Sequence, residues 1–194
     1  MSKKSPPTET SPPTPSPRIS FPGRIHFIAN DLELQAAVNA LNSAKELGFD
    51  TETRPSFKKG TVHRVALLQL ATDSDAFLFR LHHIKSFDPI KSIFENEKIL
   101  KVGAAIRDDL KQLQKIFSFT PKNFVELQEL AKAKGLKNMG LKGMTEEALQ
   151  ASLSKGPKLT NWEAHTLSEQ QRMYAATDAW IGLVLFKKIQ SGQA

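Results

Sequence analysis

Apolar residues recur along this chain with two spacings, one typical of strands and the other typical of helices. Short apolar or alternating runs predict strands at residues 24–29, 47–51, 64–71, 76–81, 99–103 and 123–127. Apolar residues three or four positions apart predict helices at residues 32–45, 90–95, 107–117 and 168–189. Ser168 and Gln171 form a capping-box pattern at the start of the last helix.

The order of these elements predicts an α/β fold. Strands that can pair antiparallel come early in the chain, and helices and strands alternate after them. The run 65–70 is nearly all apolar, as expected for a strand covered on both faces. We therefore expect one mixed sheet of five to six strands, with helices on both faces.

Composition separates a tail from this domain. Residues 1–23 contain seven of the eleven prolines together with many Ser and Thr residues. This composition is typical of a disordered segment, so we expect the folded domain at residues 24–194. The formal net charge is +7, and it is still +5 without residues 1–23. Such an excess suits a polyanionic partner such as nucleic acid, although an ordinary solvated basic face gives the same count.

The residue types that are absent exclude several classes of site. Cysteine is missing, which excludes disulfides, thiolate metal sites and cysteine catalysis. No apolar stretch reaches the length of about 18 residues that a membrane helix needs, and the start of the chain does not resemble a signal peptide. We expect a soluble cytoplasmic protein without a membrane partner, and the oligomeric state stays open.

Candidate chemistry stands at the end of one predicted strand and within the last helix. Asp50 and Glu52 lie on one side of the strand, because side chains alternate with a period of two. Tyr174 and Asp178 are four residues apart and share one helix face. If strand and helix meet, three mutually repelling carboxylates and a phenol converge. Such a cluster indicates a site for hard divalent cations with oxygen ligands, and hence phosphoryl chemistry.

The same carboxylate spacing occurs elsewhere with simpler explanations, at Asp31 and Glu33, at Asp73 and Asp75, and at Glu95 and Glu97. We expect Asp31 to cap a helix that has Glu33 in its first turn. The second pair falls in a turn, and the third falls at a helix end. Only Asp50 and Glu52 close a predicted strand and precede a predicted loop, which is where sites collect in α/β folds.

A further carboxylate follows the predicted strand 99–103, where Asp108 and Asp109 enter a helix. One of the two can project toward the same end of the sheet as Asp50. Asp108 suits the cap or first turn of the helix, a structural role worth about 1 kcal/mol at most. Asp109 is then available for the carboxylate cluster.

Three segments together resemble motifs of the 3′-to-5′ exonucleases of the DEDD superfamily, in the branch that includes ribonuclease D and the Werner-syndrome exonuclease domain. Phe49-Asp50-Thr51-Glu52 resembles the first motif, residues 102–110 the second and residues 174–178 the third. The family carboxylate comes six residues after the glycine, here Gly103, which selects Asp109. Tyr174 corresponds to the tyrosine (DEDDy) form, because Met173 stands where the histidine form would need His.

This resemblance spans residues 25–189 and implies a ribonuclease H-like fold and a 3′-to-5′ exonuclease. It implies two divalent cations, Mg²⁺ or Mn²⁺, held by the carboxylates Asp50, Glu52, Asp109 and Asp178. Two cations can activate water and stabilise both the phosphate and the leaving oxygen. On that chemistry Asp50 bridges the ions and Asp109 holds the second one. Tyr174, a poor base with a normal pKa of about 10, orients the attacking water.

The loop after the first motif supplies candidate substrate contacts. By likeness to the family, Pro55 and Phe57 stack on or wedge the terminal base, with simple loop packing as the alternative. Lys58 is a candidate for the substrate backbone, with solvation as the alternative. Thr51 completes this set. The five histidines show no metal-ligand spacing, and Trp162 is expected in the core.

Two other functions stay open alongside the exonuclease. One is a nucleic-acid-binding module that keeps the fold without catalysis, and the other is a hydrolase of small nucleotides. The binding module is disfavoured because all five positions of the family's active site carry the expected residues: Asp50, Glu52, Asp109, Tyr174 and Asp178. The small-nucleotide hydrolase is disfavoured because no motif that would enclose a base is recognisable. Glu126 stands where family members often have Asp, and residues 144–158 depart from typical relatives. The sequence leaves open whether the substrate is DNA or RNA.

Overall fold

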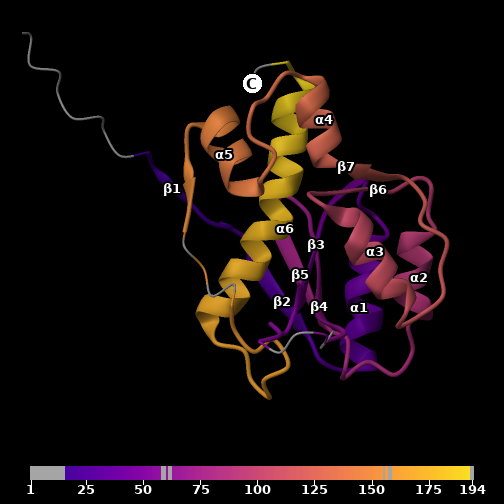
Figure 1. Ribbon diagram of the computed structural model, residues 1–194. Helices are drawn as coiled ribbons and strands as arrows, with labels where there is room; N and C mark the ends of the chain where they lie inside the picture. Colours follow the sequence, from indigo (N-terminus) through magenta and orange to yellow (C-terminus); the bar gives the residue numbers. More distant parts are fainter. Residues whose placement is uncertain (1–15, 58–59, 61–62, 155, 157–158, 193–194) are drawn as a thin grey trace, which may run out of the picture.

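The computed structural model describes residues 16–57, 60, 63–154, 156 and 159–192. Six strands form one mixed sheet in the order β2-β5-β4-β3-β6-β7, and helices lie on both sides of it (Figure 1). This arrangement confirms the α/β fold with a mixed sheet that the sequence predicts. The strands are β2 (Arg24–Ile28), β3 (Glu46–Thr53), β4 (Val65–Ala71), β5 (Asp75–Arg80), β6 (Leu100–Gly103) and β7 (Phe124–Glu126).

The strand β4 forms the antiparallel part of this sheet. It runs antiparallel to both β3 and β5, whereas the pairs β2–β5, β3–β6 and β6–β7 are parallel. Every residue of β4 is buried, which agrees with its nearly continuous apolar sequence. The strand β3 lies between β4 and β6, so its side chains meet helices on each face of the sheet.

Helices are divided between the two faces (Figure 1). One buried cluster includes side chains of α1 (Asp31–Leu41), α2 (Asp88–Phe94) and α3 (Ile106–Gln114). The other includes side chains of α4 (Leu127–Ala133), α5 (Leu141–Leu149) and α6 (Glu169–Gln190). The long helix α6 contacts the strands β2 to β6. It therefore sets the position of its own side chains relative to the end of β3.

Local hydrogen bonds explain where two of the helices begin. The backbone N–H of Gln171 donates to Ser168 Oγ over 3.2 Å, and Ser168 N–H donates back to the Gln171 side chain over 2.9 Å. This confirms the capping box of α6. At α1 the expected cap was wrong by one residue, because Asn30 Oδ1 accepts from Glu33 N–H. Asp31 instead accepts the backbone N–H of Lys85.

The expected boundary between tail and domain at residue 23 was wrong for the last residues of the tail. A short strand β1 (Arg18–Ile19) pairs in parallel with β8 (Ser152–Leu153). Phe21 is 2% exposed in the core, and its N–H donates to Thr177 Oγ1 of α6 over 3.0 Å. The fold therefore begins before residue 24. The rest of the expected tail, residues 1–15, lies outside the described residues.

Within the described residues, no helix combines the length and the apolar composition needed to cross a lipid bilayer.

Candidate active site

The strand β3 carries the first two carboxylates on the face that meets α6. Gly48, Asp50 and Glu52 alternate with a period of two and therefore share that face. A Cβ at Gly48 would overlap the backbone carbonyl of Ala179. The missing side chain thus lets the backbone of α6 approach β3 one residue away from Asp178.

This close approach completes a three-carboxylate group. Carboxylate oxygens of Asp50, Glu52 and Asp178 all lie within 4.8 Å of one another. Glu52 is buried, whereas Asp50 and Asp178 are partly exposed. The structure therefore brings together the strand pair and the helix carboxylate that the sequence predicts to meet. An all-oxygen donor set at this spacing fits hard divalent cations.

Asp109 approaches the group from the opposite face of the sheet, where α3 lies. Thr51 Oγ1 donates to Asp109 Oδ1 over 2.5 Å, and Thr51 alternates with Asp50 along β3. Burial raises the pKa of Asp109, while the hydrogen bond from Thr51 opposes that rise. Asp109 is thus held beside the three-carboxylate group without belonging to it.

The neighbouring Asp108 has a different environment. Its side chain is 89% exposed and lies 3.4 Å from Lys111 Nζ. It occupies the first turn of α3, one of the two positions that the sequence predicts for it. The start of α3 is bound by Glu126, whose carboxylate accepts the N–H groups of Ala105 and Ile106, both over 2.8 Å.

Burial and mutual repulsion shift the ionisation of the site. Burial raises the pKa of Asp50 well above its usual range, and the charges of Asp178, Glu52 and Asp109 raise it further. Burial likewise raises the pKa of Tyr174, followed by the charge of Asp178 and a hydrogen bond to it. Tyr174 is therefore a neutral hydroxyl donor at physiological pH. The carboxylates favour bound cations, because cations relieve their repulsion.

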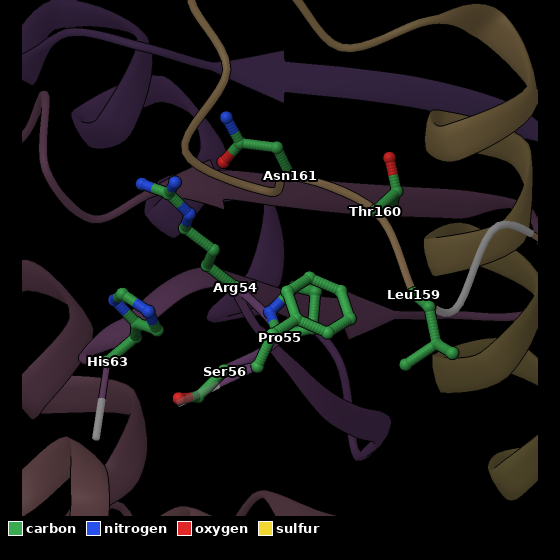
Figure 2. Close-up of a pocket in the computed structure, with 8 residues that line it drawn as sticks. Arg54, Pro55, Ser56, His63, Leu159, Thr160 and Asn161 are labelled. Carbon is green, nitrogen blue, oxygen red and sulfur yellow. The ribbon is translucent and has the colours of Figure 1, made fainter. Parts of the chain in front are cut away.

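An open pocket of about 390 Å³ begins at Arg54, two residues after Glu52 in the chain. We call it the Phe57 pocket, and it is lined by Arg54, Pro55, Ser56, Phe57, His63, Leu159, Thr160 and Asn161. Figure 2 shows the two segments 54–56 and 159–161 on different sides of it. The first segment follows Glu52 in the chain, and the second leads into Trp162. The pocket is thus linked along the chain to Glu52 on one side and, through Trp162, to the ring of Tyr174 on the other.

Two predicted substrate contacts, Pro55 and Phe57, line this pocket. Phe57 is 86% exposed, and Leu159 on the other segment is 76% exposed. Sequence reasoning missed Leu159 because a single leucine in a loop shows no periodicity. Thr51 does not line the pocket, and its hydroxyl is engaged with Asp109. Lys58 lies outside the described residues.

A buried arginine fixes the loop that follows this pocket. Arg80, at the end of β5, is 1% exposed. Its guanidinium donates to the carbonyls of Ala164 over 2.6 Å and His165 over 3.2 Å. Trp162 in the same loop is fully buried, as the sequence predicts, and its ring stacks on Tyr174 with centroids 6.2 Å apart. The loop therefore contributes to the position of the tyrosine ring.

Comparisons with known proteins give one family model and several relatives. A model described as 3′-5′ exonuclease matches residues 25–192. The mouse bifunctional 3′-5′ exonuclease/ATP-dependent helicase WRN is 32% identical over 188 residues, covering 89% of this chain and 13% of that protein. Ribonuclease D of Escherichia coli has a TM-score of 0.79 and 27% identity, covering 87% of this chain and 45% of that chain.

A third relative supports the fold alone. The exonuclease domain of Nibbler from Aedes aegypti has a TM-score of 0.79 at 22% identity, covering 87% of this chain and 88% of that chain. These structural neighbours confirm the expected ribonuclease H-like arrangement. The chain spans only 13% of the mouse protein and 45% of the bacterial one.

Proposed function

Because the chain belongs to the 3′-5′ exonuclease family, we propose that it hydrolyses phosphodiester bonds at the 3′ ends of DNA or RNA, using two divalent cations, Mg²⁺ or Mn²⁺. The observation that carries this proposal is the group of Asp50, Glu52 and Asp178, whose oxygens lie within 4.8 Å of one another. Family membership alone fits a silent binding module equally well. A silent module has no need for three buried or partly buried carboxylates that repel one another.

The proposed roles follow from where each side chain lies. Asp50, at the centre of the repelling charges, would hold one cation together with Glu52 and Asp178. Asp50 and Asp109 would hold the second. When bound, the cations lower the pKa of the attacking water and stabilise charge on the phosphate and the leaving oxygen. Tyr174, kept neutral by burial, orients the water through its hydroxyl group. This arrangement corresponds to the tyrosine (DEDDy) form.

The Phe57 pocket receives the terminal nucleotide in this proposal. An exposed aromatic ring gives a base a surface for stacking, an interaction worth about 1–3 kcal/mol per base in single-strand binding proteins. Phe57 supplies that ring, and Pro55 and Leu159 supply further apolar surface. Thr51 and Lys58 complete the proposed substrate contacts, Thr51 through its backbone because its hydroxyl binds Asp109.

The natural polymer is either DNA or RNA. Ribonuclease D of Escherichia coli is described as an exoribonuclease involved in structured RNA processing, whereas the mouse relative combines an exonuclease with a helicase. The chain matches only a part of each of these two proteins, 13% of the mouse protein and 45% of the bacterial one. Matched DNA and RNA oligonucleotides of one sequence distinguish these substrates. We also propose a cytoplasmic location.

The test of the proposed function is the change Asp50→Ala. The variant should lose nearly all release of nucleotides from a 5′-labelled oligonucleotide in Mg²⁺ or Mn²⁺, because a carboxylate that both cations would need is gone. Asp73→Ala is the matched control, since Asp73 is 70% exposed and pairs with Lys187 on the surface. The wild type should shorten the oligonucleotide stepwise from its 3′ end and stop when EDTA is added. Normal digestion by the Asp50→Ala variant would refute the proposal.

A further inference from the structure

A second cavity, of about 530 Å³, lies next to the Phe57 pocket. We call it the Arg64 groove, and its walls include His63, Arg64, His82, Ile116 and Glu163. His63 lines both cavities. Arg54 of the pocket also pairs with Glu163 of the groove, with 3.3 Å between Nη1 and Oε2. The two cavities are therefore neighbours joined by one shared residue and one ion pair.

The charges of the groove suit a polyanion. Arg64 is exposed at the surface and supplies the positive charge, whereas burial and the charge of Arg80 lower the pKa of His82. Among the described residues that line the groove, Glu163 is the only carboxylate, and its charge is balanced by Arg54. An anionic chain that enters from the Phe57 pocket therefore meets positive charge and no unpaired negative charge.

The floor of the groove is apolar. Val65, Ala66 and Leu81 are each no more than 4% exposed, and all three line the cavity. Proteins that bind single strands combine a basic groove along the backbone with aromatic side chains on which bases stack. Here Arg64 supplies the charge, and Phe57 of the neighbouring pocket supplies the ring. A duplex fits this combination less well, because paired bases cannot stack on the exposed ring of Phe57.

We propose that the Arg64 groove binds the single-stranded nucleic acid upstream of the terminal nucleotide, with Arg64 contacting a backbone phosphate. This inference rests on the proposed function, since the pocket must hold the 3′ end for the groove to hold what precedes it. The partner is an unpaired strand at least several nucleotides long. A dinucleotide ends before the groove and gains little from Arg64.

The test compares substrates of two lengths. Arg64→Ala should weaken binding of a single-stranded oligonucleotide of about 12 nucleotides roughly fivefold and should reduce the slope of log affinity against log salt by about 0.7, the value for one lost phosphate contact. Binding is measured by fluorescence anisotropy in EDTA, which does not depend on hydrolysis. In Mg²⁺ or Mn²⁺, kcat/KM for the long substrate should fall several times more than kcat/KM for a dinucleotide.

Lys98→Ala is the matched control, because Lys98 is an exposed cation that precedes β6, at the opposite end of the sheet from Asp109. It should leave affinity and salt slope unchanged. Equal losses on long and short substrates, or no loss of affinity in the Arg64→Ala variant, would overturn the groove proposal. Salt-dependent binding through Arg64 without any hydrolysis by the wild type would retain the groove and refute the exonuclease.

Discussion

At the scale of single residues, the site depends on Gly48 as much as on the carboxylates. A Cβ there would overlap the carbonyl of Ala179, so any larger residue would push α6 away from β3. Asp178 would then move away from Asp50 and Glu52. A residue without functional groups thus determines whether three carboxylates share one site. The spacing of the carboxylates along the chain could be read from the sequence, but this close approach could not.

The pair Asp108 and Asp109 gives the sharpest residue-scale prediction. Asp109→Asn should lower turnover by orders of magnitude and shift the metal requirement to higher Mg²⁺ or Mn²⁺, because a neutral amide holds a cation less well than a carboxylate. The measurement is kcat as a function of metal concentration. Asn can still accept the hydrogen bond from Thr51, so the variant should fold.

Asp108→Asn is the matched control for this change. Its side chain is 89% exposed, and removing its charge costs only a small interaction with the start of α3, less than about 1 kcal/mol. Turnover should therefore stay near that of the wild type. Equal losses in both variants, or a loss confined to Asp108→Asn, would show that assigning the second cation to Asp109 is wrong.

At the scale of elements, the sequence predicted those strands and helix starts that leave a local pattern of residues. The six strands of the main sheet and the start of α6 were predicted, because alternation and capping are local properties. The end of α1 at Leu41 was missed by four residues, since Ser43 bonds back to the carbonyl of Ala40. β1 and β8 have two residues each, too few for any period. Contacts such as Arg80 with Ala164 join residues far apart and leave no local pattern.

The N-terminal segment that contains β1 and the buried Phe21 leads to an element-scale prediction. Phe21→Ala should reduce the free energy of unfolding by about 3–5 kcal/mol, because a fully packed aromatic ring is replaced by a cavity. Phe21 packs edge-to-face against Trp180 of α6, with centroids 5.9 Å apart. Urea unfolding followed by circular dichroism measures the loss. Ser20→Ala, an exposed neighbour, should change stability by less than about 0.5 kcal/mol, and an equally small effect of Phe21→Ala would place residue 21 outside the core.

At the scale of the whole molecule, the fold holds mutually repelling carboxylates close together at one end of its sheet. The raised pKa of Asp50 means that the native state holds this proton more tightly than the unfolded chain does. Its contribution to stability is therefore present at low pH and is lost as pH rises through the folded pKa. A cation that binds only the native state offsets that loss.

Cation binding should consequently raise Tm. Saturating Mn²⁺ or Mg²⁺ at about 100 times its dissociation constant adds roughly 2.7 kcal/mol to the free energy of unfolding at a single site. In EDTA the Asp50→Ala variant should melt at or above the wild-type temperature, because one repelling charge is gone. The variant should lose most of the increase produced by the metal. An identical increase in both proteins, measured by differential scanning calorimetry, would show that the stabilising cations bind elsewhere.

The pairing of β1 with β8 also constrains the order in which the chain can fold during its synthesis. Residue 18 pairs with residue 152, and the N–H of Phe21 bonds to a side chain 156 positions later. A ribosome releases the N-terminal strand long before either partner exists. Strands β2 to β5 can pair as soon as they emerge, whereas β1 must wait for residues 152–153 and Asp50 must wait for Asp178. Nascent chains should therefore become resistant to protease before they become able to cut nucleic acid.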